Sequence, residues 1–517
     1  MNPNLLYTFA LERYPEQTAI IFNEQRLTFR QFQCRSNKLG NALLNLGLKK
    51  GQKVAVLLQN SLELAESLTG ISKAGLAIVP LNARQSGPEH AYILHDAEAD
   101  ALIVGESFFE VVEPFLSDIP RLKHLIRVGG GKNGLDYHEL VDPQSETLPE
   151  IEVQEEDIDR IHYTSGTTGK PKGVVGTFGI TYHRLVNAWI NLDQPIGPGD
   201  INLNIGPLTH AAGFMMSIYS LRGAANVILD KFDIDLVLQT IEKEKVTAVL
   251  FIPTMMNMIL MHPHLHRYDL SSLKRIWYGT APMAPEKIKE GIKIFGNIFR
   301  QNYGLTEAPQ PILFLGPEDH IIEGTEKEKR RLASAGKPAL GVAVKIIKED
   351  NTEIKPGEIG EITLRTIQVM KEYWKNPQAT AEAFRGGWFH TGDMATVDDD
   401  GFIYIMDRKH DMIISGGFNI YPREVEDAIM THPLVAEAAV IGVPDEVWGE
   451  SVKAFVVSKP DSSVSTEEII EVCTRQLAGY KKPKSIEFVD DLPKNAYGKV
   501  LRKKLKEPFW QGRERRV

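Results

Sequence analysis

Cysteine is almost absent from this chain of 517 residues. Only Cys34 and Cys473 occur, far apart in the sequence and without a C-x-x-C spacing. This excludes a disulfide framework and a thiolate zinc site. We therefore expect a protein of the reducing cytoplasm.

Long hydrophobic runs are missing as well. The N-terminal segment has no basic region before its short apolar run and reaches Glu12 early, so we expect no secretory signal. The longest apolar run, residues 247–261, is shorter than the roughly 18 to 20 residues that span a membrane and contains Pro253 and Asn257. We expect no transmembrane segment and interpret this run as a buried strand followed by a helix.

The chain has no excess of positive charge. It contains 59 Lys and Arg against 68 Asp and Glu, a net charge of −9, which argues against a nucleic-acid partner. Peripheral membrane association and a homodimer stay open. Neither H-E-x-x-H nor G-x-S-x-G occurs, which removes the zincin and serine-hydrolase classes. A G-x-G-x-x-G match at residues 129–134 has too short a helical segment before Pro143, so we interpret it as a surface turn.

What the chain does contain is a pattern of buried strands and amphipathic helices. Predicted strands of the first part lie at residues 53–58, 76–82, 101–105 and 124–129. This alternation predicts an α/β fold with layered subdomains, and after about residue 340 glycine-punctuated strands predict a β-rich subregion. We expect a large N-terminal domain, residues 1–406, and a small α+β C-terminal domain, residues 407–517.

A glycine-rich and hydroxyl-rich loop, "YTSGTTGKPKG", occupies residues 163–173. Glycines let backbone N–H groups converge on an anion, and the hydroxyls and lysines add donors and charge, so the loop suits a polyphosphate. It is not a Walker A loop, because only two residues separate Gly166 from Gly169 and Lys170 is followed by Pro171. Taken alone, it could equally be a flexible surface loop.

Six further motifs follow this loop in order. They are "PLTHAAGF" (207–214), "YGTAP" (278–282), "QNYGLTE" (301–307), "WFHTGD" (388–393), "DRKHDMIISGGFNIYPREVE" (407–426) and "PKNAYGKVLR" (493–502). The set resembles the adenylate-forming superfamily of acyl-CoA synthetases, luciferases and peptide-synthetase adenylation domains, over nearly the whole chain. The segments "KEYWKNPQATAEAF" and "VIGVPDEVWGE" look most like fatty-acyl and related carboxylate:CoA ligases.

The resemblance implies a two-step reaction on a carboxylic acid. The acid is joined to AMP with release of pyrophosphate, and the thiol of coenzyme A then attacks the acyl-adenylate. ATP, Mg²⁺ and coenzyme A are implied, and a medium-chain or long-chain fatty acid, or a related hydrophobic or aromatic acid, is the expected substrate. An amino-acid or carrier-protein adenylating enzyme, luciferase-type oxidation and a non-catalytic nucleotide or acyl-CoA binding module are the alternatives.

The resemblance also implies the residues that bind the nucleotide and the metal. The β- and γ-phosphates would contact Thr164, Ser165, Gly166, Thr167, Thr168, Gly169 and Lys172, with Thr306 beside them. Mg²⁺ would be held by Glu307 and Thr164. Adenine would lie against Gly279, Thr280, Ala281, Pro282, Asn302, Tyr303 and Gly304, and the ribose against Asp393 and Arg408.

Lys499 lies in a basic C-terminal stretch, which by itself indicates only a solvated tail. The resemblance implies instead that Lys499 bridges the carboxylate and the α-phosphate, so the expected catalytic residues are Lys499, Thr164, Glu307 and His210. It further implies a mobile C-terminal domain with its hinge at residues 407–411, and a pantetheine channel at Gly416 and Gly417. At the hinge His410 replaces the Asp or Lys of relatives.

The acyl pocket is expected to draw on residues near the "PLTHAAGF" and "YGLTE" motifs. These are Gly213, Phe214, Trp277, Ala308 and the methionine-rich run 255–261. The methionine run equally fits a plain hydrophobic core. His210 would stand at the mouth of the pocket, or be a satisfied core histidine.

Overall fold

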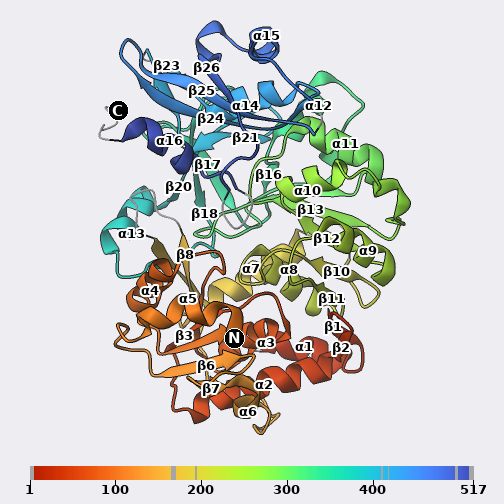
Figure 1. Ribbon diagram of the computed structural model, residues 1–517, viewed down its shortest axis with the longest axis vertical. Coiled ribbons are helices and arrows are strands. Elements are labelled where there is room, and N and C mark those ends of the chain that lie inside the picture. Colours follow the sequence, from red (N-terminus) through yellow and green to blue (C-terminus); the bar gives the residue numbers. More distant parts are fainter. Residues whose placement is uncertain are drawn as a thin grey trace.

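Figure 1 presents the computed structural model, with the N-terminal part at the bottom of the view and the C-terminal part at the top. The structure describes residues 5–164, 171–191, 195–408, 411–416, 418–460, 462–494 and 499–511. Two large sheets, a four-stranded sheet and a C-terminal sheet make up the fold. The expected α/β class, with a large N-terminal part and a small C-terminal part, is confirmed.

The first large sheet contains the two strands, β8 and β9, that flank the glycine-rich loop. Its strand order is β19-β9-β8-β4-β3-β5-β6-β7, parallel from β8 to β7 and antiparallel at β9 and β19. The strands are β3 (Lys53–Leu57), β4 (Ala77–Pro80), β5 (Ala101–Gly105), β6 (His124–Val128), β7 (Leu135–Asp136), β8 (Ile158–Thr164), β9 (Lys172–Thr177) and β19 (Glu372–Tyr373). The inner strands are apolar runs buried on both faces, as parallel strands covered by helices are.

The second large sheet has nine strands in the order β16-β15-β14-β13-β12-β10-β11-β1-β2. They are β1 (Thr18–Phe22), β2 (Gln25–Thr28), β10 (Ile201–Asn204), β11 (Ala225–Ile228), β12 (Ala248–Phe251), β13 (Arg275–Gly279), β14 (Phe299–Tyr303), β15 (Leu313–Leu315) and β16 (Lys337–Pro338). The apolar run 247–261 forms β12 and then the helix α10 (Pro253–Leu260), as predicted.

Helices fill the space between and around these sheets. They are α1 (Leu5–Arg13), α2 (Phe29–Asn45), α3 (Leu62–Lys73), α4 (Gly87–Asp96), α5 (Glu106–Leu116), α6 (Tyr137–Val141), α7 (Phe178–Ile190), α8 (Ala211–Ser220), α9 (Ile234–Glu244), α11 (Pro285–Phe295), α12 (Glu326–Arg330) and α13 (Pro377–Ala383). Ile20 of β1, Leu39 of α2, Ala65 of α3 and Val56 of β3 belong to one buried cluster. The two large sheets are thus packed against each other through α2 and α3. No helix in the described part of the chain could cross a membrane.

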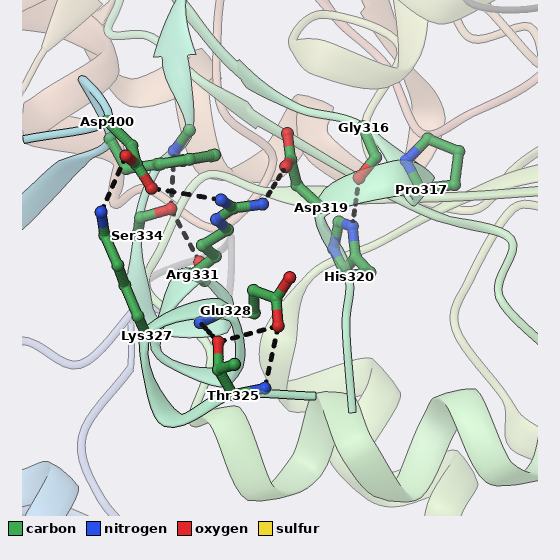
Figure 2. Close-up of polar contacts among 12 residues, drawn as sticks. Gly316, Pro317, Asp319, His320, Thr325, Lys327, Glu328, Arg331, Ser334 and Asp400 are labelled. Carbon is green, nitrogen blue, oxygen red and sulfur yellow. Dashed lines mark hydrogen bonds and ion pairs between the residues drawn. The ribbon is translucent and has the colours of Figure 1, made fainter. Parts of the chain in front are cut away.

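The β-rich subregion is the antiparallel sheet β17-β18-β20-β21, formed by β17 (Ala343–Ile347), β18 (Gly360–Arg365), β20 (Phe389–Val397) and β21 (Ile403–Arg408). A charge cluster, shown in Figure 2, fixes its β20–β21 turn to the segment that joins β15 to β16. Arg331 pairs with Asp319 at 3.1 Å and with Asp400 at 3.2 Å, and Lys327 pairs with Asp400 at 2.8 Å. These pairs hold the four-stranded sheet against the second large sheet.

The C-terminal part has its own sheet and helices. The sheet contains β22 (Ile413–Ser415), β23 (Phe418–Ile420), β24 (Val435–Asp445), β25 (Gly449–Ser458) and β26 (Ser485–Phe488), and the helices are α14 (Pro422–Met430), α15 (Thr466–Gln476) and α16 (Arg502–Trp510). A buried cluster that includes Ile413, Val425, Val440 and Ile469 forms a separate core. The boundary expected after residue 406 falls near the end of β21, which continues to Arg408.

Candidate active site

The central feature of the site is a carboxylate held between two large side chains. Asp393 of β20 accepts a 2.6 Å hydrogen bond from the hydroxyl of Tyr303 and pairs with Nε of Arg408 at 2.6 Å. Asp393 and Arg408 are directly opposite each other in the β20–β21 ladder. Three of the residues expected at the nucleoside therefore come from two different sheets and meet at one point.

Burial and charge set the ionisation of this group. Burial, and then the charge of Asp393, raises the pKa of Tyr303 well above its usual range, so its phenol stays protonated and donates. The neighbouring Asp393 raises the pKa of Arg408. The Asp393 carboxylate therefore accepts from one phenol and one guanidinium, and among the described residues the other side-chain N–H groups of Arg408 have no further carboxylate partner.

Lys499 of the C-terminal part lies near this carboxylate. The surrounding protein and then the charge of Arg408 lower the pKa of Lys499, whereas Asp393 acts in the opposite direction. Lys499 is solvent-exposed, although many protein atoms lie around its ammonium group. The structure thus brings Lys499 within electrostatic range of Asp393 and Arg408 across a long separation in sequence.

A second group of residues surrounds Glu307. The hydroxyl of Tyr373 donates a 3.0 Å hydrogen bond to Oε1 of Glu307. Nζ of Lys172 lies 5.2 Å from the centre of the Tyr373 ring, and Lys172 is paired with Thr164 at the end of the β8–β9 hairpin. Tyr373 therefore joins the base of the glycine-rich loop to the "YGLTE" segment.

The residues expected to form the adenine wall lie where β13 and β14 end side by side. Gly279 is in register with Asn302, and a Cβ atom at Gly279 would lie only 2.3 Å from the Asn302 carbonyl oxygen. Thr280 has a positive φ of 65°, which turns the chain away from the sheet. Oδ1 of Asn302 is buried and has no hydrogen-bond partner among the described residues, so a ligand donor fits there.

His210 and His162 form a half-buried histidine pair, with His162 on β8 and His210 just before α8. Their Nε2 atoms are 2.7 Å apart, and Nδ1 of His210 is 2.8 Å from the hydroxyl of Thr209. Burial lowers the pKa of His162 to about 3 and that of His210 well below its usual value. Both rings are neutral at ordinary pH, and one donates to the other.

The residues expected in the acyl pocket lie in different surroundings. Trp277 and Phe214 belong to one cluster with residues of α7 and α8. Gly213 packs closely on the chain before α8, since a Cβ there would lie 1.9 Å from the carbonyl oxygen of Leu208. The methionine-rich run does not form one surface, because Met256 is buried in the core while Met258 is 47% exposed.

Several expected residues are not joined to these groups. Ser165, Gly166, Thr167, Thr168, Gly169, His410 and Gly417 lie outside the described residues. Gly416 contacts Trp448 in the C-terminal part, with its backbone N–H donating to the Trp448 carbonyl at 2.8 Å. Ala281 and Pro282 follow Thr280 in the loop after β13, and Thr306 and Gly304 belong to the turn after β14.

Three residues of this region were not predicted from the sequence: His162, Tyr373 and Arg184. His162 could have been found, because it lies two residues before Thr164 and the two therefore share one face of β8. Tyr373 and Arg184 carry no comparable signal in the sequence. No cluster of three or more potential metal-binding side chains occurs in the described parts of the chain.

Comparison with known proteins agrees with the fold and with the motifs. Residues 8–374 match the family model of the AMP-binding enzyme, and residues 424–499 match that of the AMP-binding enzyme C-terminal domain. The medium/long-chain-fatty-acid–CoA ligase FadD8 of Mycobacterium tuberculosis is 34% identical, over 98% of this chain and 90% of that protein. The 2-succinylbenzoate–CoA ligase of Bacillus licheniformis is 38% identical, over 98% and 99%.

A solved structure, the anthranilate CoA ligase AuaEII in complex with anthranoyl-AMP, superposes with a TM-score of 0.91 at 30% identity, over 98% of this chain and 97% of that one. The chain therefore belongs to the adenylate-forming superfamily of AMP-binding enzymes. Within that superfamily it is an AMP-forming acid–CoA ligase family enzyme, for which ATP and coenzyme A are the family's substrates.

Proposed function

We propose that this enzyme activates a carboxylic acid with a hydrophobic or aromatic body and transfers the acyl group to coenzyme A. In the first step a carboxylate oxygen bonds to the α-phosphorus of ATP and pyrophosphate leaves. In the second, the sulfur of coenzyme A bonds to the acyl carbon and AMP leaves. The observation that carries the proposal is the Tyr303–Asp393–Arg408 group with Lys499 beside it.

The nucleoside would be bound by this group and by the adenine wall. Asp393 would accept hydrogen bonds from the ribose hydroxyls, and Arg408 would donate to the same sugar. The ring of Tyr303 would lie against adenine, whose exocyclic amino group would donate to the unpartnered Oδ1 of Asn302. Gly279 to Pro282 would form the opposite wall.

The phosphates would lie between the glycine-rich loop and Glu307. Lys172 and the hydroxyls of Thr164 and Thr306 are suitable donors, and residues 165–169 are proposed to complete the loop. A single carboxylate with phosphate oxygens and waters is a common way to hold Mg²⁺, so Glu307 with Thr164 fits this ion. When bound, Mg²⁺ would neutralise charge on the phosphates.

Lys499 would supply the charge that the reaction itself requires. The attack brings an anionic carboxylate against an anionic phosphate, and charge accumulates on the pentavalent α-phosphate. The charges of Asp393 and Arg408 both act on Lys499, so its ammonium would reach the substrate carboxylate and the α-phosphate beside the proposed ribose site. Removal of water by the surrounding protein, and then the charge of Arg408, lower the pKa of Lys499, while Asp393 favours its charged form.

The second step would require a rearrangement of the C-terminal part about residues 407–411. Asp407 accepts hydrogen bonds from the backbone N–H groups of Arg408 at 2.8 Å and Arg423 at 3.2 Å, which makes it the junction of the two parts. A cleft of about 1480 Å³ between the four-stranded sheet and the C-terminal part leaves space beside this junction. Gly416 and Gly417 would then line the path of the pantetheine arm.

Pyrophosphate release tests the proposal directly. The enzyme is incubated with ATP, Mg²⁺ and single members of a panel of fatty, aryl and amino acids, with and without coenzyme A. We expect acid-dependent pyrophosphate release, and acyl-CoA formation when coenzyme A is added. Pyrophosphate release without use of coenzyme A would indicate a carrier-protein or amino-acid adenylating enzyme, and no release with any acid would indicate a nucleotide-binding module.

A further inference from the structure

Arg184 of α7 is a half-buried cation without a counter-ion among the described residues. Its Nε donates to the carbonyl oxygen of Gln310 at 3.1 Å, and Cζ lies 3.5 Å from the centre of the Phe214 ring. Burial, together with the charge of Arg160, lowers its pKa well below the usual value. A guanidinium in such a place is destabilised unless an anion accompanies it.

Two other arginines of the protein, Arg275 and Arg160, have the carboxylate partner that Arg184 lacks. Arg275 is buried on β13 and pairs with Asp200 at 3.2 Å, and Arg160 pairs with Asp159 at 2.8 Å. No described carboxylate lies within ion-pair distance of Arg184, and its terminal nitrogens are not among the buried atoms without partners. These two nitrogens therefore keep some accessible surface, at which a ligand could accept hydrogen bonds.

That space lies on the acyl side of the site. Phe214, which supports the guanidinium, follows His210 on α8, and the charge of Arg184 lowers the pKa of His162 in the histidine pair. Gln310 follows the Glu307 segment in sequence. Arg184 is thus surrounded by the residues that separate the nucleotide from the acyl pocket.

We infer that Arg184 binds a second carboxylate of the acyl substrate, so that the preferred substrate is a dicarboxylic acid activated at one end only. The inference rests on the proposed acid–CoA ligase function. A guanidinium presents two parallel N–H donors that match a carboxylate, and the Phe214 ring fixes its plane. An alkyl chain end placed there would leave the cation buried without a partner.

The test compares matched acids. The series hexanoic to dodecanoic acid and the α,ω-dicarboxylic acids of the same lengths are assayed for kcat/KM of pyrophosphate release with the wild-type enzyme and with Arg184→Met, Arg184→Lys and Arg160→Met. At the best length we expect the wild type to prefer the diacid by at least about tenfold, the value of one charged hydrogen bond.

Arg184→Met should reverse this preference by lowering kcat/KM for the diacid while that for the monoacid rises or stays. Arg184→Lys should keep part of the preference, and Arg160→Met, which removes a paired cation, should keep all of it. A wild-type preference for monoacids at every length, or an equal loss for both series in Arg184→Met, would overturn the inference while leaving the ligase function standing. If none of the acids supported pyrophosphate release, the ligase function itself would be overturned. The wild-type comparison decides the matter even if a variant does not fold.

Discussion

The hydroxyl of Tyr373 donates a 3.0 Å hydrogen bond to the carboxylate of Glu307. The two residues are distant in sequence. Tyr373 belongs to β19, the strand that pairs with β9 at one edge of the first large sheet. The donor therefore fixes the orientation of the proposed Mg²⁺ ligand relative to the phosphates.

Tyr373→Phe is predicted to weaken the use of Mg²⁺. Loss of a hydrogen bond to a metal ligand typically costs about 10- to 100-fold in metal affinity, so we expect the Mg²⁺ concentration for half-maximal pyrophosphate release to rise by at least about tenfold. Tyr404→Phe is the control, because Tyr404 makes a similar 2.9 Å bond to Asp398 away from the site. An unchanged Mg²⁺ requirement in Tyr373→Phe would contradict the role assigned to the Tyr373 hydroxyl.

Lys499→Ala is predicted to separate the two half-reactions. We expect adenylation to fall by at least about 10²-fold, because a preorganised donor to the transition state is lost. Thioester formation from supplied acyl-adenylate and coenzyme A should continue. Lys503→Ala, an exposed lysine of α16, serves as the control and should leave both rates unchanged. Equal losses in both half-reactions would contradict the role assigned to Lys499.

The neutral histidine pair predicts a simple pH profile. The folded-state pKa of His162 is about 3 and that of His210 is lowered too, so neither gains a proton between about pH 5.5 and 8. The rate of adenylation should therefore show no step from these residues in this range. His210→Gln should lower the rate without changing the shape of the profile. An acidic limb near the usual histidine pKa that disappears in His210→Gln would show that His210 titrates.

Lys73 predicts a pH dependence of stability. It is buried between α2 and α3, where Asn37 accepts its hydrogen bond at 2.6 Å, and burial lowers its pKa from 10.5 to about 7. Between about pH 7 and 10.5 Lys73 is protonated in the unfolded chain and neutral in the folded protein. The free energy of unfolding therefore rises with pH over this range, by at most about 1.4 kcal/mol per pH unit from this residue.

The measurement is the thermal midpoint from about pH 7 to 9.5, the range in which only the unfolded state protonates this lysine. Lys73→Met, which keeps the length of the side chain, should show a smaller rise of the midpoint with pH than the wild type. Lys503→Met, on the exposed surface, should keep the wild-type slope. Identical slopes in the wild type and Lys73→Met would mean that Lys73 is protonated in the folded protein.

The sequence predicted the parts of the protein that depend on local pattern. The strands β3 to β6 and the passage from β12 into α10 follow from runs of apolar residues, and the residues proposed for the nucleotide site lie in short motifs. What could not be predicted depends on the pairing of distant segments. Nothing local in "ITYHRL" indicates that Arg184 lies under the Gln310 carbonyl, or that Tyr373 points at Glu307. These contacts arise only when the sheets pack.

The ladder pair Asp393–Arg408 has a consequence for how the enzyme turns over. Arg408 is the last residue of β21, so the same rung that would hold the ribose is also the point from which the C-terminal part leaves the sheet. In the proposed function, release of AMP would free Arg408 from the ribose at the residues about which the C-terminal part would turn. Product departure and resetting of the domains would then occur together, and a ligand that stays on the ribose rung would delay the next catalytic cycle.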